Sequence, residues 1–240
     1  MSLVPLRKSL FRFLYFIYLF GGITLAFAQK TDSLAVLTAQ ESAIQQYHKA
    51  TFLNARYFNG REYTIQEFRP IGHQFFESLD WDTTSIVYNG YSYDGVHAVY
   101  DIHRDIYVIQ NHDGLNRIML SPEDLSGFTI HGHRFTRLSK GINPGYYEVI
   151  YDGKTKVYCK RFKTRTEDLS DRTVQIIYNI DDRYYILKDQ KYHQVKSKKS
   201  VLQLLGDKKR EVRRFMRGKL YKENRKKSIG EMAAYYDQIR

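Results

Sequence analysis

The chain has 240 residues, a single cysteine and a formal net charge of +12 at pH 7. One cysteine excludes an internal disulfide, so the fold must be stabilised by packing rather than by covalent cross-links. The length is sufficient for one domain that buries a substantial apolar core.

The first 28 residues are typical of a secretory signal peptide. Three cations precede an apolar run over residues 13–28, which ends in the small-x-small sequence AFA. The run is shorter than the roughly 20 residues that a membrane-spanning helix needs, and an uncleaved anchor is the alternative interpretation. We expect cleavage between Ala28 and Gln29, export to the periplasm or the extracellular space, and no transmembrane helix after cleavage.

The segments that follow differ in their apolar periodicity. Residues 29–50 have apolar side chains at helical spacing, which predicts an N-terminal helix or leader. From residue 51 to residue 195 the period changes to two, and Asn-Gly and Asp-Gly pairs, typical of tight hairpin turns, recur. This pattern predicts about ten to twelve short, mostly antiparallel strands, with one turn expected at Asp181-Asp182.

Residues 196–240 return to a helical pattern. Ser197 or Ser200 is suited to begin a first helix that Gly206 ends, Asp207 to cap a second, and Ser228 to begin a third. The predicted fold class is therefore α+β, a mostly antiparallel β-rich body with an N-terminal helix and a basic helical C-terminal segment. The expected divisions are a signal peptide (1–28), a leader helix (29–50), a β-rich domain (51–195) and a basic helical segment packed on it (196–240).

Nearly all of the positive charge lies in residues 196–227, which we call the basic segment. It holds fourteen Lys or Arg and three acidic residues, a formal charge of +11. One interpretation is a solvated face of helices whose apolar stripe packs on the β-rich body. The other is a surface that binds an anionic lipid or lipopolysaccharide layer, or an acidic envelope protein. Nucleic acid would fit the charge but not the export signal. The cations expected to bind are Lys208, Lys209, Arg210, Arg213, Arg214 and Arg217.

Catalytic signatures are missing from the sequence. It contains no Gly-x-Ser-x-Gly elbow, no Ser-x-x-Lys and no glycine-rich phosphate loop, and Cys159 has no catalytic motif around it. We therefore expect a non-enzymatic binding or structural protein without a cofactor. The alternative is a metal-assisted hydrolase, because imidazole and carboxylate together can hold a divalent ion. Its candidate ligands are His97, Asp101, His103, His131 and His133.

A set of short motifs resembles a family of exported proteins known mainly from the genomes of envelope-rich Gram-negative bacteria. The matching residues are Gly72–Phe76, Tyr88–Gly90 with Tyr93, Tyr100-Asp101, Gly132–Phe135, Tyr184–Leu187, Lys196–Ser200 and Tyr235–Asp237. The likeness extends over most of the chain after residue 28. It implies an exported protein of one architecture, and it implies no activity.

Overall fold

The structure is a computed structural model that describes residues 36, 38–40, 42–43, 60–64, 70–111, 114–169 and 174–240. The chain divides into two compact units, residues 1–55 and residues 56–240. In the first unit the described residues are helical. The expected signal peptide, its cleavage site at Ala28-Gln29 and most of the expected leader helix lie outside the described residues.

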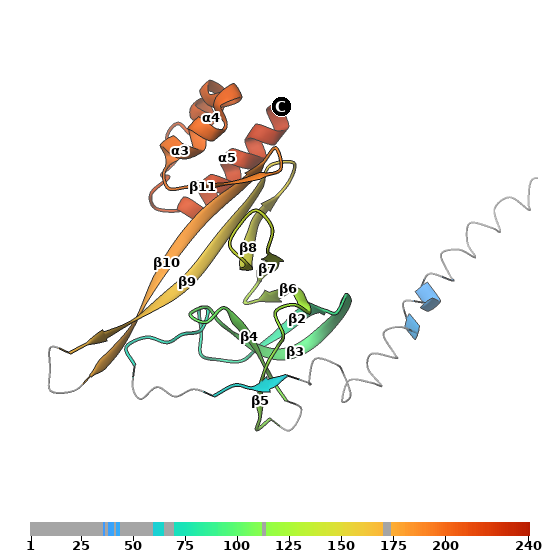
Figure 1. Ribbon diagram of the computed structural model, residues 1–240. Coiled ribbons are helices and arrows are strands. Elements are labelled where there is room, and N and C mark those ends of the chain that lie inside the picture. Colours follow the sequence, from blue (N-terminus) through green and yellow to red (C-terminus); the bar gives the residue numbers. More distant parts are fainter. Residues whose placement is uncertain are drawn as a thin grey trace, which may run out of the picture. The chain divides into compact units, whose positions relative to one another are not determined.

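The second unit is built on one antiparallel sheet of eleven described strands (Figure 1), which confirms the predicted α+β, β-rich fold class. Their spatial order is β1-β5-β4-β3-β2-β6-β7-β8-β9-β10-β11. The strands are β1 (Arg61–Glu62), β2 (Asp82–Tyr88), β3 (Tyr91–Asp101), β4 (Ile106–Gln110), β5 (Arg117–Met119), β6 (Leu125–Ile130), β7 (His133–Leu138), β8 (Gly145–Asp152), β9 (Lys156–Asp168), β10 (Gln175–Lys188) and β11 (Lys191–Val195).

An irregular segment, residues 70–76, connects strands that are distant in the sheet order. Ile71 forms a parallel bridge to Ile177 of β10, and Phe75 forms an antiparallel bridge to Asp101 of β3. The backbone N–H of Phe76 also donates to the carbonyl of Tyr100 at 2.8 Å. The sheet is therefore held in a curved form by backbone hydrogen bonds on both sides of this segment.

Aromatic side chains fill the inside of the curved sheet. Phe128 stacks on Phe135 with ring centroids 5.0 Å apart, and Tyr100 meets both rings edge-on. All three side chains are buried. The abundance of aromatic residues in the strands is thus explained largely by core packing.

The turn expected at Asp181-Asp182 is absent, because β10 runs unbroken through both residues. The turn lies instead at Asp189-Gln190, where both residues have positive φ. Asp182 accepts hydrogen bonds from Nε and one terminal nitrogen of Arg161 on β9, at 2.8 and 3.0 Å. This cross-strand ion pair keeps the acidic pair in the middle of a strand.

Three α-helices follow the sheet: α3 (Lys198–Leu204), α4 (Lys209–Phe215) and α5 (Arg225–Ile239), with a short 3-10 turn, η3 (Gly206–Lys208), before α4. Ser197 caps α3, which confirms one of the two predicted starting residues of this helix. The predicted start of the last helix at Ser228 is wrong, because Asn224 caps α5 by accepting from the N–H of Lys227 at 3.1 Å. Asp207 does not cap α4; its carboxylate accepts from the hydroxyl of Tyr236.

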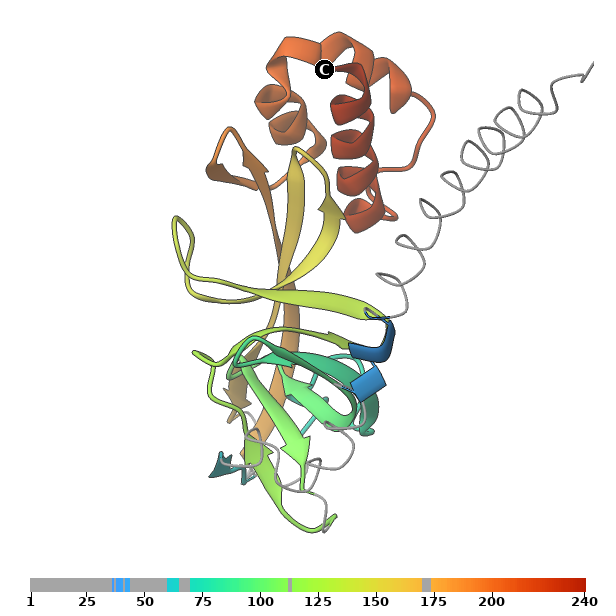
Figure 2. The same ribbon diagram turned by 90° about the vertical axis from the view of Figure 1, so that its right-hand side faces the viewer.

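The apolar sides of these helices are buried against one end of β8–β11 (Figures 1 and 2). Cys159 lies in this core, and burial raises the pKa of its thiol well above the ordinary value. It is therefore a small packed side chain rather than a reactive group. The buried helical residues are Val201, Leu202, Leu205, Val212, Met216, Ile229, Met232, Ala233 and Tyr236.

Candidate anion-binding surface

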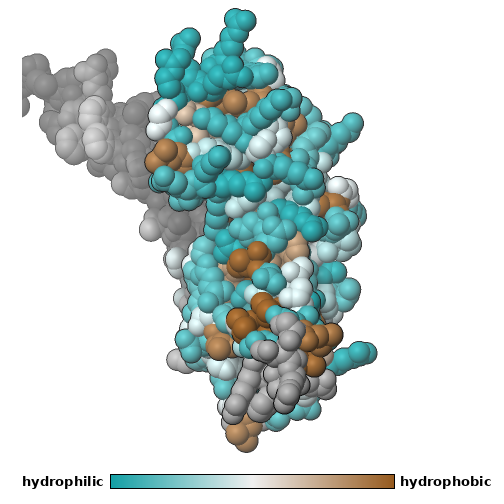
Figure 3. Space-filling view, turned by 90° about the vertical axis from the view of Figure 1, so that its left-hand side faces the viewer, coloured by the Kyte–Doolittle hydropathy of each residue, from teal (hydrophilic) through white to brown (hydrophobic). Residues whose placement is uncertain are grey.

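Five of the six cations predicted to bind lie on η3 and α4, and the sixth, Arg217, lies in the turn after α4. The four arginines are exposed and the two lysines are half-buried, while Val212 and Met216 on the opposite side are buried. Within the described part of the chain, none of the six side chains has a hydrogen bond or an ion pair. Figure 3 shows long hydrophilic side chains projecting from this helical end of the unit. We call this set of six side chains the α4 face: Lys208, Lys209, Arg210, Arg213, Arg214 and Arg217.

Other cations of the basic segment have structural partners. Lys198 Nζ donates to the carbonyl of Met216 at 3.2 Å, and Lys219 Nζ donates to Glu231 at 2.8 Å. Lys226 Nζ forms an ion pair with the buried carboxylate of Glu148. The charge of the segment is thus divided between residues that stabilise the fold and residues that face solvent.

A cavity of about 740 Å³ lies beside the helices, lined by two stretches of the basic segment. Residues 196–199 precede and begin α3, whereas residues 219–225 connect α4 to α5. We call it the lysine pocket, and its cationic lining residues are Lys196, Lys198, Lys199, Lys219, Lys222 and Arg225. The sequence identified the charge of these residues but not that folding brings the two stretches together.

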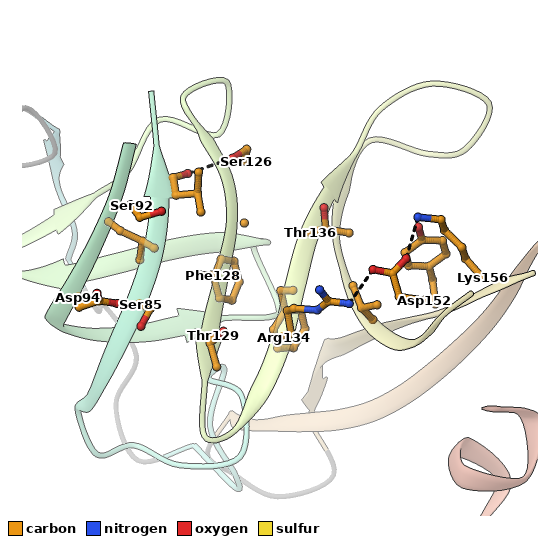
Figure 4. A pocket seen from close by; sticks show the side chains of 16 residues that line it. Ser85, Ser92, Asp94, Ser126, Phe128, Thr129, Arg134, Thr136, Asp152 and Lys156 are labelled. Carbon is orange, nitrogen blue, oxygen red and sulfur yellow. Dashed lines mark hydrogen bonds and ion pairs between the residues drawn. The ribbon is translucent and has the colours of Figure 1, made fainter. Parts of the chain in front are cut away.

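A second cavity, of about 460 Å³, lies on the outer side of the sheet between β2, β3 and β6–β9 (Figure 4). Serine and threonine side chains line one part of it, and Asp152 lies at the other end between two cations. Asp152 is 2.9 Å from Arg134 and 2.7 Å from Lys156. The charged residues that line this cavity are two carboxylates, Asp94 and Asp152, and two cations, Arg134 and Lys156. Their formal charges cancel, so this cavity lacks the positive charge of the lysine pocket.

The first three predicted metal ligands do not converge. His97 is exposed on β3, whereas Asp101 is fully buried and accepts from the hydroxyl of Tyr63 at 2.7 Å. His103 Nδ1 contacts the carbonyl of Lys163 at 2.9 Å. Asp101 and His103 are thus engaged in different local contacts, and His97 is exposed to solvent.

The last two predicted ligands are separated by the β6–β7 hairpin turn, where His131 and Gly132 have positive φ. His131 lies near Asp82 (3.6 Å), while His133 Nδ1 contacts Glu148 at 2.6 Å. Among the residues that the structure describes, no group of three or more His, Cys, Asp or Glu is arranged to hold a metal ion.

Sequence reasoning missed the charge network around Glu148. This carboxylate on β8 is only 4% exposed, and it contacts His133 of β7 and Lys226 of α5. His133 Nε2 lies 3.3 Å from Glu77 on the segment before β2. The network joins the last helix to the sheet, and no sequence spacing indicates it because its members are far apart along the chain.

In the described part of the chain no helix is both long and apolar enough to cross a membrane. Comparison with known proteins finds no matching family model, no matching curated protein and no matching solved structure.

Proposed function

We propose that this protein is an exported, non-enzymatic binding module of the cell envelope that docks electrostatically on an anionic lipid surface. The docking surface is the α4 face. The observation that carries the proposal is a group of four exposed arginines, three on α4 and one in the turn after it, that have no hydrogen-bond or ion-pair partner among the described residues. Export rests on the signal-like residues 1–28.

Several weak electrostatic contributions add together at such a surface. Each Lys or Arg close to an anionic membrane contributes about 1 kcal/mol, and the attraction falls off within a Debye length. Six cations on one helical end are sufficient for reversible binding. Because Val212 and Met216 pack inside the fold, the helix has no free apolar face to insert between acyl chains. The proposed contact is therefore peripheral.

The composition of the α4 face favours a lipid surface over an acidic protein. Stable protein interfaces usually have an apolar or aromatic centre surrounded by polar groups. Here the nearest aromatic residue, Phe215, is half-buried and stacks on Tyr235 with ring centroids 4.2 Å apart. A surface of cations without an apolar centre matches a continuous layer of anionic headgroups.

Co-sedimentation with vesicles tests the proposal. The processed protein, isolated from the exporting cells, is mixed at low salt with phosphatidylcholine vesicles that contain or lack phosphatidylglycerol. Binding is expected only to the anionic vesicles. The variant Lys208→Gln, Lys209→Gln, Arg213→Gln, Arg214→Gln should lose most of it, since four contributions of about 1 kcal/mol are removed.

A matched control separates the α4 face from net charge. The variant Arg61→Gln, Lys140→Gln, Lys154→Gln, Lys191→Gln removes four exposed cations elsewhere in the unit and should bind almost as well as the unaltered protein. Equal loss in both variants would contradict a specific α4 face. Binding to polyglutamate without binding to vesicles would replace the lipid surface by an acidic protein.

A further inference from the structure

We propose that the lysine pocket binds a single phosphomonoester headgroup of the lipid surface on which the α4 face docks. This inference rests on the proposed function and adds a ligand chemistry to it. The α4 face would supply general attraction to negative charge, whereas the pocket would distinguish one kind of anion.

Like charges converge around the lysine pocket. Six cationic residues line the pocket, and Glu223 is the one acidic residue among the described lining residues. Lys196, Lys199 and Lys222 are exposed, and their side chains have no hydrogen bond or ion pair with a described residue. Like charges held close together repel, and a bound anion would offset that repulsion.

The remaining cations of the pocket are already held in place by hydrogen bonds. Lys198 and Lys219 donate to Met216 and Glu231, and a terminal nitrogen of Arg225 donates to the carbonyl of Val195 at 3.1 Å. The pocket thus combines a fixed frame with three free lysines. Such preorganisation reduces the entropy that binding would otherwise cost.

Two lining residues of the pocket contain polar atoms without a hydrogen-bond partner. Arg225 Nε and the Tyr221 hydroxyl are buried and have no hydrogen-bond partner. Burial raises the pKa of the Tyr221 hydroxyl, and the positive charge of the nearby Arg225 partly offsets this rise. The two groups are nevertheless not arranged to form a hydrogen bond with each other. Buried polar groups are normally paired, and both groups are hydrogen-bond donors of the kind that phosphate oxygens accept.

The surroundings of the pocket favour a lipid-borne phosphate over a free one. Leu220, which lines the pocket, is 65% exposed and is flanked by Lys219 and Tyr221. An apolar side chain at a cationic rim suits the boundary between headgroups and acyl chains. The loop also follows directly after Arg217 of the α4 face, so both surfaces belong to one stretch of chain.

The charge of the ligand explains the expected selectivity. A phosphomonoester carries close to two negative charges at neutral pH, whereas the phosphodiester of phosphatidylglycerol carries one. Three unpartnered lysines around one pocket gain more from the doubly charged group. The pocket is therefore expected to prefer phosphatidic acid over phosphatidylglycerol.

The test compares two vesicle compositions of equal surface charge, phosphatidylcholine with phosphatidic acid and phosphatidylcholine with phosphatidylglycerol. The unaltered protein should bind the phosphatidic acid vesicles more tightly. The variant Lys199→Gln, Lys222→Gln should lose this preference, with about a fivefold weaker affinity for phosphatidic acid per lysine removed. Both lysines are exposed and unpartnered, so the substitutions leave the fold intact.

The α4 face variant distinguishes failure of the pocket from failure of the docking proposal. It should weaken binding to both vesicles and keep the preference for phosphatidic acid. Binding without any preference in the unaltered protein would overturn the pocket and leave the docking proposal standing. Full competition by soluble glycerol phosphate, with no difference between the vesicles, would also overturn the lipid-borne ligand.

Discussion

At the scale of single residues, Glu148 shows how part of the basic segment contributes to stability rather than to binding. Its carboxylate is buried, which is costly unless cations or donors surround it. Lys226 supplies a positive charge from α5, and His133 contacts the same oxygen. The second oxygen, Oε2, is buried without a partner, so the carboxylate depends strongly on Lys226.

Replacing Lys226 should therefore destabilise the fold. We expect Lys226→Met to lower the free energy of unfolding by about 2–3 kcal/mol, somewhat below the value for a fully buried pair because His133 remains. Urea denaturation measures this change. Lys227→Met is the matched control, since the Lys227 side chain is 70% exposed and its loss should cost less than about 0.5 kcal/mol. Equal effects of the two substitutions would contradict the role of Lys226.

We expect Asp152 to make a contribution to stability that is lost at acidic pH. Hydrogen bonds from Lys156 and then from Arg134 lower the pKa of this carboxylate below its ordinary value. A lowered folded-state pKa means that the stabilisation is present above the unfolded pKa of about 3.9 and is lost as the pH falls below it. The melting temperature of Asp152→Asn should therefore fall less steeply between about pH 5 and pH 2 than that of the unaltered protein. Parallel curves for the two proteins would contradict this assignment.

At the scale of elements, local turn chemistry could be predicted and long-range pairing could not. The Asn89-Gly90 turn forms because both residues adopt the positive φ that a tight hairpin requires. Asp181-Asp182 looked similar in the sequence but stays within β10, because its partner Arg161 lies on another strand. The predicted cap of α5, Ser228, lies about one turn after the observed cap, since Asn224 is as good a cap as Ser228.

The packing of α5 against the sheet predicts that its buried residues contribute to the stability of the fold. Met232 is fully buried in the core formed by the helices and β9–β11. Met232→Ala should lower the free energy of unfolding by about 2–5 kcal/mol, because it removes apolar contacts and leaves a cavity. Leu220→Ala, at an exposed position, should change it by less than about 0.5 kcal/mol in the same urea titration. A comparable loss in both would mean that α5 does not form part of the cooperative core.

At the scale of the whole molecule, charge is distributed very unevenly. The basic segment carries a formal charge of +11, nearly the whole net charge of the chain. Composition and periodicity were sufficient to predict that these six cations lie in the helical segment after the sheet, while their role in binding stays a prediction. The lysine pocket could not be predicted, because it requires residues 196–199 and 219–225 to meet in space.

The most direct test of electrostatic docking is the affinity for anionic vesicles over a series of ionic strengths. The Debye length falls from about 30 Å at 0.01 M to about 8 Å at 0.15 M. Docking through the α4 face predicts that the affinity falls steadily as salt is added, with no binding to neutral phosphatidylcholine vesicles. Binding that is unaffected by salt, or equal on neutral vesicles, would contradict the account.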